Sequence, residues 1–168
     1  YRNLRLARAK SIDSGKPFWT FAQVGDGFTD GNTANIDESY LPTAAEMQWE
    51  INASLAFGSK GIQYYSVVQP EQYAKNTDGT YDYTRSGLIS ANGEKNTRYF
   101  DVAKSINNYI ATIDEVLMNS ESKALIVNDS NASKYVTGVT GYNEVESVNG
   151  TNALVGCFNY FGKTALWL

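Results

Sequence analysis

Residues 42–70 read PTAAEMQWEINASLAFGSKGIQYYSVVQP and predict a helix, a tight return and a buried strand. Thr43 and Glu46 fit a capping box at the start of the helix, because their side chains are spaced to bond each other's backbone N–H groups. Gly58 supplies a left-handed stop, and Gly61–Val68 predicts a β-branched and aromatic strand. The apolar face of the helix is formed by Ala44, Met47, Trp49, Ile51, Leu55 and Ala56. A helix followed by a buried strand is the repeating unit of a parallel sheet or barrel, so the predicted fold class is α/β.

The composition is that of a globular chain. Of 168 residues, 42% are hydrophobic and 19% are charged, which suits one domain or one domain and part of another. A net charge of -4 argues against non-specific nucleic-acid partners and against binding to an anionic membrane surface. No run of apolar residues is long enough to predict a membrane span. Because the chain starts Tyr1-Arg2-Asn3 without Met, we expect a mature or excised piece of a longer protein.

The chemistry available to this chain is narrowed by its single cysteine and its lack of histidine. These counts exclude a disulfide framework, a Cys/His zinc site and histidine-based catalysis, and we expect neither a metal nor a cofactor. Cys157 lies in an apolar run and is predicted to be a buried structural thiol. The 12 tyrosines and 3 tryptophans stand out instead, because flat aromatic rings also bind the apolar faces of sugars.

The flanking segments predict further elements on both sides of the central unit. Before the central unit they are a helix over 1–14, a strand over Phe18–Val24 that is covered on both faces, and a polar loop over 25–41. After it come a second insertion over 71–96, with turns at Asp78-Gly79 and Asn92-Gly93, and a helix over 97–117. The last elements are strands at 124–127, 134–136, 153–160 and 164–168, with a hairpin turn at 161–163. The two long loops are expected to be functional or mobile.

Several motifs follow one order along the chain. They are Gly15-Lys16-Pro17-Phe18-Trp19, Pro42-Thr43-Ala44-Ala45-Glu46, Ser54 to Tyr65, Gly87-Leu88-Ile89, Gly93, Thr97, Tyr99 and Ile106-Asn107. This order resembles the last third of the (β/α)8 barrel in β-galactosidases of glycoside hydrolase family 42 and their relatives, many of which gut bacteria export. The resemblance implies that Phe18–Val24 and Gly61–Val68 are barrel strands seven and eight. It implies a C-terminal part of a barrel over 1–118 and the truncated start of a β-sandwich over 119–168.

The resemblance to this family also implies binding partners and a location. We expect a carbohydrate partner, an oligo- or polysaccharide, and a missing N-terminal part of the same barrel. We also expect an extracellular or cell-surface location.

The resemblance also implies where the site lies, at the C-terminal ends of the strands. The mouth of the barrel would be built by Ala22, Gln23, Asp26, Ser66, Val68 and Gln69. The candidate substrate-binding residues are Trp19, Gln23, Tyr65 and Gln69. The alternative for Trp19, Phe21, Tyr64 and Tyr65 is packing in the core or against helices.

Catalysis in the resembled family needs two carboxyl groups, of which the acid/base sits on a strand that this chain lacks. The position of the nucleophile falls on Ala22, with Gln23 next to it, and neither is a carboxylate. Asp26 and Glu71 are the nearest carboxylates and the candidate catalytic residues. The alternative is that both are solvated loop residues. Glu50 is assigned to the helix and to no catalytic role.

Two functions therefore stay open. One is a glycoside hydrolase-like barrel that acts on β-galactosides or related glycans. The other is a non-catalytic carbohydrate-binding or surface scaffold protein that kept the barrel and lost the nucleophile of strand seven. A third reading, an incidental proteolytic product without a function of its own, is compatible with either.

Overall fold

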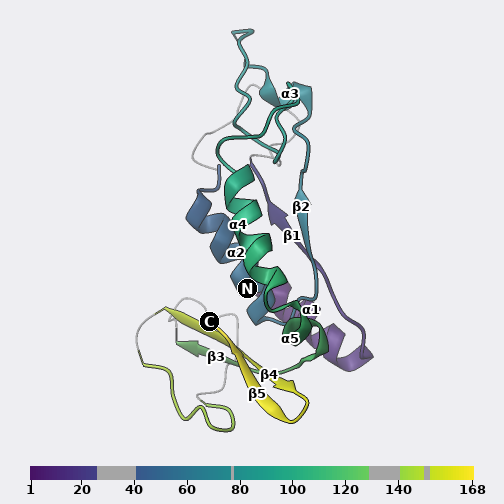
Figure 1. Cartoon of the computed structure of the whole chain (residues 1–168), viewed down its shortest axis with the longest axis vertical. Coiled ribbons are helices and arrows are strands. Elements are labelled where there is room, and N and C mark those ends of the chain that lie inside the picture. The colour runs from purple at the N-terminus through teal and green to yellow at the C-terminus, as the bar shows by residue number, and fades with distance from the viewer. Residues whose placement is uncertain (26–40, 77, 129–140, 150–151) are drawn as a thin grey trace. The chain divides into compact units, whose positions relative to one another are not determined.

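The computed structural model describes residues 1–25, 41–76, 78–128, 141–149 and 152–168 (Figure 1). The elements in chain order are α1 (Arg2–Ser14), β1 (Thr20–Gln23), α2 (Ala44–Ala56), β2 (Ile62–Tyr65), α3 (Glu71–Ala74), α4 (Phe100–Ala111), α5 (Asp114–Asn119), β3 (Glu121–Asn128), β4 (Ala153–Tyr160) and β5 (Lys163–Trp167). The α/β class is confirmed. The two described sheets have two and three strands, and neither closes into a barrel. The predicted strand at 134–136 and Asp26 lie outside the described residues.

The chain divides into two compact units. The first unit comprises Tyr1–Thr20, Ile51–Ile62 and Ile113–Leu168, and the second comprises Phe21–Glu50 and Gln63–Thr112. No helix in the described part of the chain has the length and apolarity needed to cross a membrane.

The helix predicted from the central stretch is present as α2, and its ends are those that the sequence specifies. The backbone N–H of Thr43 donates to Glu46 Oε2 at 2.7 Å, and the Glu46 N–H donates to Thr43 Oγ1 at 3.2 Å, which confirms the capping box. Gly58 ends the helical run with φ +94°, as predicted. Met47 and Ile51 are fully buried, but Trp49 is 54% exposed. The prediction that Trp49 and Ala44 belong to the buried apolar face is wrong, because their positions on the helix leave both side chains exposed.

Strands β1 and β2, which precede and follow α2 in the sequence, pair in parallel. The Thr20 N–H donates to the Gly61 carbonyl at 3.0 Å, and the Val24 N–H donates to the Tyr65 carbonyl at 2.9 Å, so both chains advance in the same direction. Ala22 is 1% exposed, whereas its neighbour Phe21 is 64% exposed. The prediction that this strand is covered on both faces is therefore wrong. Side chains alternate along a strand, and only one set of them is packed.

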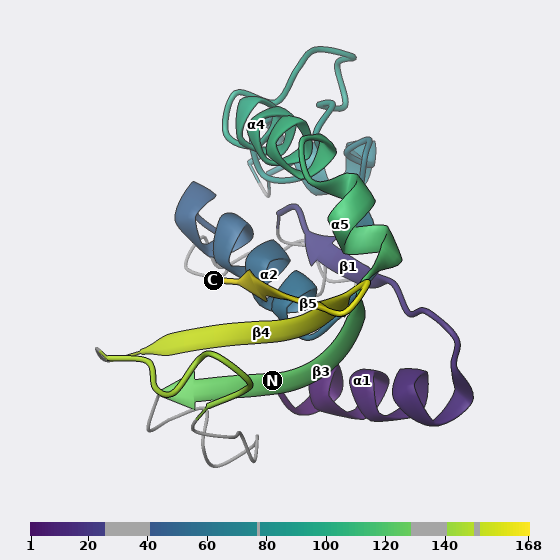
Figure 2. The same ribbon diagram turned by 60° about the horizontal axis from the view of Figure 1, so that its bottom comes forward.

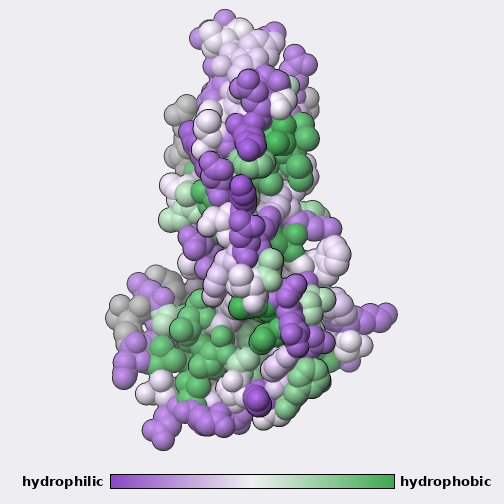
Figure 3. Space-filling model, in the orientation of Figure 1, coloured by the Kyte–Doolittle hydropathy of each residue, from purple (hydrophilic) through white to green (hydrophobic). Residues whose placement is uncertain are grey.

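The three-stranded sheet of the first unit is antiparallel, in the order β3-β4-β5. On one face, Ala124, Ile126, Val155 and Cys157 form a buried cluster, which confirms the buried thiol. The other face packs Leu125 on Phe57, with apolar side chains of α1 beside them, and Figure 2 shows α1 running along β3. The β4–β5 hairpin turns at 161–162 as predicted, with both residues at positive φ. Figure 3 shows hydrophobic surface over this hairpin, where β5 forms an edge of the sheet.

One predicted helix is broken in two. The sequence pattern predicts a single helix over 97–117, but α4 ends at Ala111 and α5 begins at Asp114. The Thr112 N–H and hydroxyl both donate to the Tyr109 carbonyl, at 3.0 and 2.7 Å. Thr side chains compete with the helical pattern in this way, because they offer the backbone another partner.

Candidate functional site

The candidate site lies in the second unit, where β1 and β2 end. The segment Arg85–Ile89 is bonded to both strand ends: the Gly87 N–H donates to the Val24 carbonyl at 3.0 Å, and the Ile89 N–H donates to the Val67 carbonyl at 2.8 Å. Gly25 makes this approach possible, because a Cβ on it would lie 2.2 Å from the Arg85 carbonyl oxygen. The segment Arg85–Ile89 of the second insertion predicted from sequence therefore covers the strand ends.

Gln23, a predicted substrate-binding residue, is partly buried at the end of β1. Its side-chain Nε2 donates to the Gly25 carbonyl at 2.9 Å, and its backbone N–H donates to Glu50 Oε2 at 3.0 Å. The second bond assigns Glu50 a role that its position on α2 does not reveal. Only the folded backbone brings this carboxylate to the strand, so no sequence pattern could have found it.

Gln69, the second predicted amide, is 2% exposed and serves the loop structure. Its Nε2 donates to the Asp82 carbonyl at 3.2 Å, and its Oε1 accepts from the Ala91 N–H at 3.3 Å. Asn96 acts in the same way nearby, where its Nδ2 donates to the Ser86 carbonyl at 3.1 Å. Both polar ends of Gln69 are thus occupied by backbone groups, which is what a buried amide requires.

Asp82 organises the charged part of the same loop. Its carboxylate accepts from the Thr84 N–H at 2.9 Å and from the Thr84 hydroxyl at 2.8 Å, and it lies 3.4 Å from Arg85 Nε. Partial burial works to raise the pKa of Asp82, but these hydrogen bonds and the charges of Arg85 and Arg98 outweigh it, so the pKa is lowered. Asp82 stays ionised and structural, and no role was assigned to it from sequence.

An aromatic surface remains open beside this loop. The rings of Phe21 and Tyr65 meet edge to face with centroids 6.4 Å apart, and they are 64% and 48% exposed. Val67, two residues beyond Tyr65, is also exposed. By strand alternation, the backbone places Gln23 on the same face as Phe21, while Ala22 lies on the packed face. Tyr65 of the predicted set is therefore beside Phe21, and we call Phe21 and Tyr65 the open face.

The other predicted residues are Trp19, Glu71 and Asp26. Trp19 belongs to the first unit, where its ring lies against Gly61, since a Cβ on Gly61 would be 2.7 Å from it. Glu71 is exposed in the first turn of α3. Asp26 lies outside the described residues, so its role stays a prediction.

The described groups at the strand ends include amide, carboxylate and aromatic side chains. Amide, hydroxyl and aromatic groups bind polar ligands with flat apolar faces, but an amide cannot act as a nucleophile toward a sugar. Within the described ranges, acidic residues and Cys157 form no cluster that could hold a metal ion.

Comparison with known proteins adds no family to these observations. No protein-family model matches the chain, and no curated protein matches it.

Proposed function

We propose that this chain forms the C-terminal part of a (β/α)8-barrel protein of the family-42 β-galactosidase type, which acts on β-galactosides or related glycans. Strand β1, helix α2 and strand β2 form a strand–helix–strand unit with parallel strands, which is the repeat of such barrels. In this proposal β1 and β2 are strands seven and eight, residues 1–118 belong to the barrel, and residues 119–168 open a β-sandwich. The protein then works outside the cell or at its surface.

The open face is the observation that carries the proposal. Phe21 and Tyr65 expose aromatic rings on the strand face opposite to the packed Ala22 and Val24. In a barrel, this second face lines the interior, and the strand ends with their loops form the ligand site. Aromatic rings there would stack on the apolar faces of sugar rings, and Gln23 would supply hydrogen bonds to hydroxyl groups.

A second candidate function, glycan binding without hydrolysis, is favoured by the end of β1. A retaining glycosidase needs a carboxylate nucleophile, and the expected position falls on Ala22, which is buried on the packed face. Gln23, on the open side, carries an amide in place of a carboxylate. The loss of the nucleophile leaves the means to bind a glycan but not to cleave it.

Hydrolysis by the full-length protein distinguishes the two functions. The assay uses aryl β-galactoside and a panel of other aryl glycosides, with Gln23→Ala, Asp26→Ala and Glu71→Ala beside the parent and Glu46→Gln as a control on α2. Turnover abolished by Asp26→Ala or Glu71→Ala, but kept in Glu46→Gln, would identify a relocated carboxylate and reject the scaffold function. Glycan binding without turnover would support the scaffold function, and neither binding nor turnover would contradict both.

A further inference from the structure

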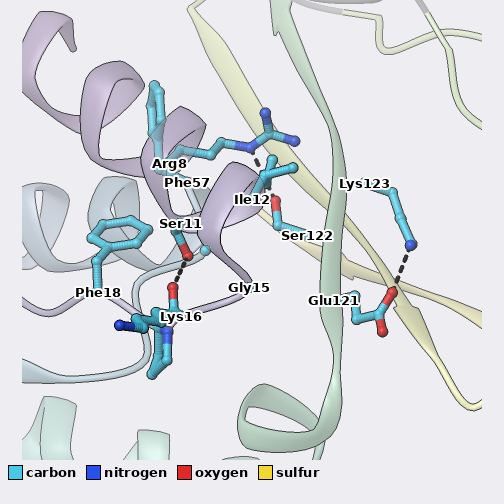
Figure 4. A pocket seen from close by; sticks show the side chains of 12 residues that line it. Arg8, Ser11, Ile12, Gly15, Lys16, Phe18, Phe57, Glu121, Ser122 and Lys123 are labelled. Carbon is cyan, nitrogen blue, oxygen red and sulfur yellow. Dashed lines mark hydrogen bonds and ion pairs between the residues drawn. The ribbon is translucent and has the colours of Figure 1, made fainter.

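A cavity of about 400 Å³ lies in the first unit, and all its lining residues belong to that unit. It opens between α1, the segment 15–18 that follows it, the end of α2 and the start of β3 (Figure 4). Its volume falls within the range of about 300–1,000 Å³ that is usual for small-molecule sites. Two features of its lining indicate the chemistry of a ligand: an arginine and an apolar wall.

A hydrogen bond to a residue outside α1 fixes the side chain of Arg8. Its Nε donates to Ser122 Oγ at 3.0 Å, across 114 positions of the sequence. Figure 4 shows the side chain reaching from α1 toward β3, with the two outer guanidinium nitrogens beyond the bond to Ser122. A guanidinium fixed at Nε keeps its outer N–H groups for a further planar acceptor.

Arg8 has no ion-pair partner among the described residues. Among the described residues, the ion pairs within bonding distance are Arg85 with Asp82 and Lys123 with Glu121, and neither includes Arg8. The half-buried position lowers the pKa of Arg8 through desolvation, so an anion at the guanidinium would relieve an unfavourable environment.

The carboxylate in the lining of the cavity, Glu121, already has a cationic partner. Glu121 Oε2 lies 2.6 Å from Lys123 Nζ, and Figure 4 shows these two side chains meeting on the other side of β3 from Arg8. The register of β3 against β4 is irregular between Ser122 and Ala124, and Figure 4 shows Ser122 on the side of Arg8. Lys16, at the C-terminal end of α1, adds a second cation to the lining. The cavity therefore carries a positive charge that no described side chain neutralises.

The remaining wall is apolar and suits the body of a ligand. Ile12, Pro17, Phe18 and Phe57 line it beside the polar group around Arg8. Inorganic phosphate would need donors around several oxygens, whereas a carboxylate needs only one planar fork.

We propose that this cavity binds a small carboxylate with an apolar body, such as an aromatic or cyclic carboxylic acid, whose two oxygens are held by the outer N–H groups of Arg8. The ring or alkyl body lies against the apolar wall. This site is independent of the proposed glycan function, because all its lining residues belong to the first unit.

The probes are benzoate, its neutral analogue benzamide, and inorganic phosphate, each titrated into the full chain. Binding is followed by backbone amide NMR shifts of Arg8, Ile12, Phe18 and Ser122. We expect saturable shifts with benzoate, and binding of benzamide and phosphate at least tenfold weaker. Equal binding of benzoate and benzamide would overturn the proposal, as would tighter binding of phosphate or no saturable shift with any probe.

Variants of two arginines on α1 test whether the outer N–H groups of Arg8 bind the carboxylate. Arg8→Gln should weaken benzoate binding at least tenfold, and Arg8→Lys should keep only part of the affinity, since an ammonium lacks the planar fork. Arg5→Gln removes an exposed arginine of the same helix and should leave the affinity unchanged. An equal loss in Arg5→Gln and Arg8→Gln would show a general charge effect and overturn the proposal. If Arg8→Gln does not fold, the comparison of benzoate with benzamide on the parent chain decides.

Discussion

The parallel pair β1–β2 and the antiparallel sheet β3-β4-β5 use similar apolar residues in opposite ways. In the antiparallel sheet, both faces are packed: Leu125 lies on Phe57, and Cys157 lies in a second cluster on the other face. In the parallel pair, Ala22 and Val24 are buried while Phe21 is 64% exposed. Parallel strands are normally covered on both faces, whereas only one face of this pair is covered among the described residues.

The largest effect on stability is expected at Phe57, and the exposed phenylalanine to compare with it is Phe21. Phe57 is fully buried in the first unit, so Phe57→Ala should lower the free energy of unfolding by about 3–5 kcal/mol. Urea unfolding followed by circular dichroism measures the change. A loss below about 1 kcal/mol would contradict the packing described for this side chain.

The second-largest effect on stability is expected at Gln69, the buried amide of the loop at the strand ends. Gln69→Ala leaves the Asp82 carbonyl and the Ala91 N–H without their side-chain partner, which costs about 1–3 kcal/mol. Gln63→Ala on β2 removes an exposed amide and serves as the control. If both variants unfold at the same urea concentration, Gln69 does not hold the loop.

The capping box gives a smaller effect with a defined pH dependence. Thr43→Ala should cost about 1 kcal/mol at pH 7. Hydrogen bonds from the Thr43 backbone N–H and side chain hold the pKa of Glu46 below its usual range. The contribution of the ionised Glu46 is therefore fully present above the ordinary glutamate pKa and is lost as the pH falls through the lowered folded value. Thr43→Ala keeps the backbone N–H and removes only the side-chain bond to the ionised Glu46, so the gap between parent and Thr43→Ala should narrow in part from pH 7 to pH 3. A gap that widens would contradict the assignment.

The smallest effect on stability is expected at the open face. In the chain of residues 1–168, Phe21→Ala should change the free energy of unfolding by no more than about 0.5 kcal/mol, because the ring is exposed. A loss comparable to that of Phe57→Ala would show that the face is covered in solution. The difference between the regions would then disappear.

Local patterns predicted the elements well where a few neighbouring residues decide them. The capping box at Thr43, the stop at Gly58 and the buried Cys157 are all present. The break at Thr112 was missed because the threonine hydroxyl bonds the Tyr109 carbonyl, and helical spacing continues across it in the sequence. Exposure of Trp49 was missed for a similar reason, since hydrophobicity alone does not tell which face of a helix is packed.

The candidate site was less predictable than the elements. Gln23 and Gln69 were both expected to bind substrate, but Gln69 is buried in backbone bonds that only the folded loop supplies. Glu50 at the Gln23 N–H and Ser122 at Arg8 depend on contacts between distant parts of the chain. Such contacts follow from tertiary structure and leave no local signal in the sequence.

The most direct test of the glycan proposal is calorimetric titration of a β-linked galacto-oligosaccharide into the full-length protein and into Tyr65→Ala. Trp49→Ala, which removes an exposed aromatic ring from α2, is the control. We predict saturable binding to the parent and to Trp49→Ala, and binding at least tenfold weaker in Tyr65→Ala, because Tyr65 belongs to the open face. Unchanged affinity in Tyr65→Ala, or no binding of the parent, would contradict the role of the open face in glycan recognition.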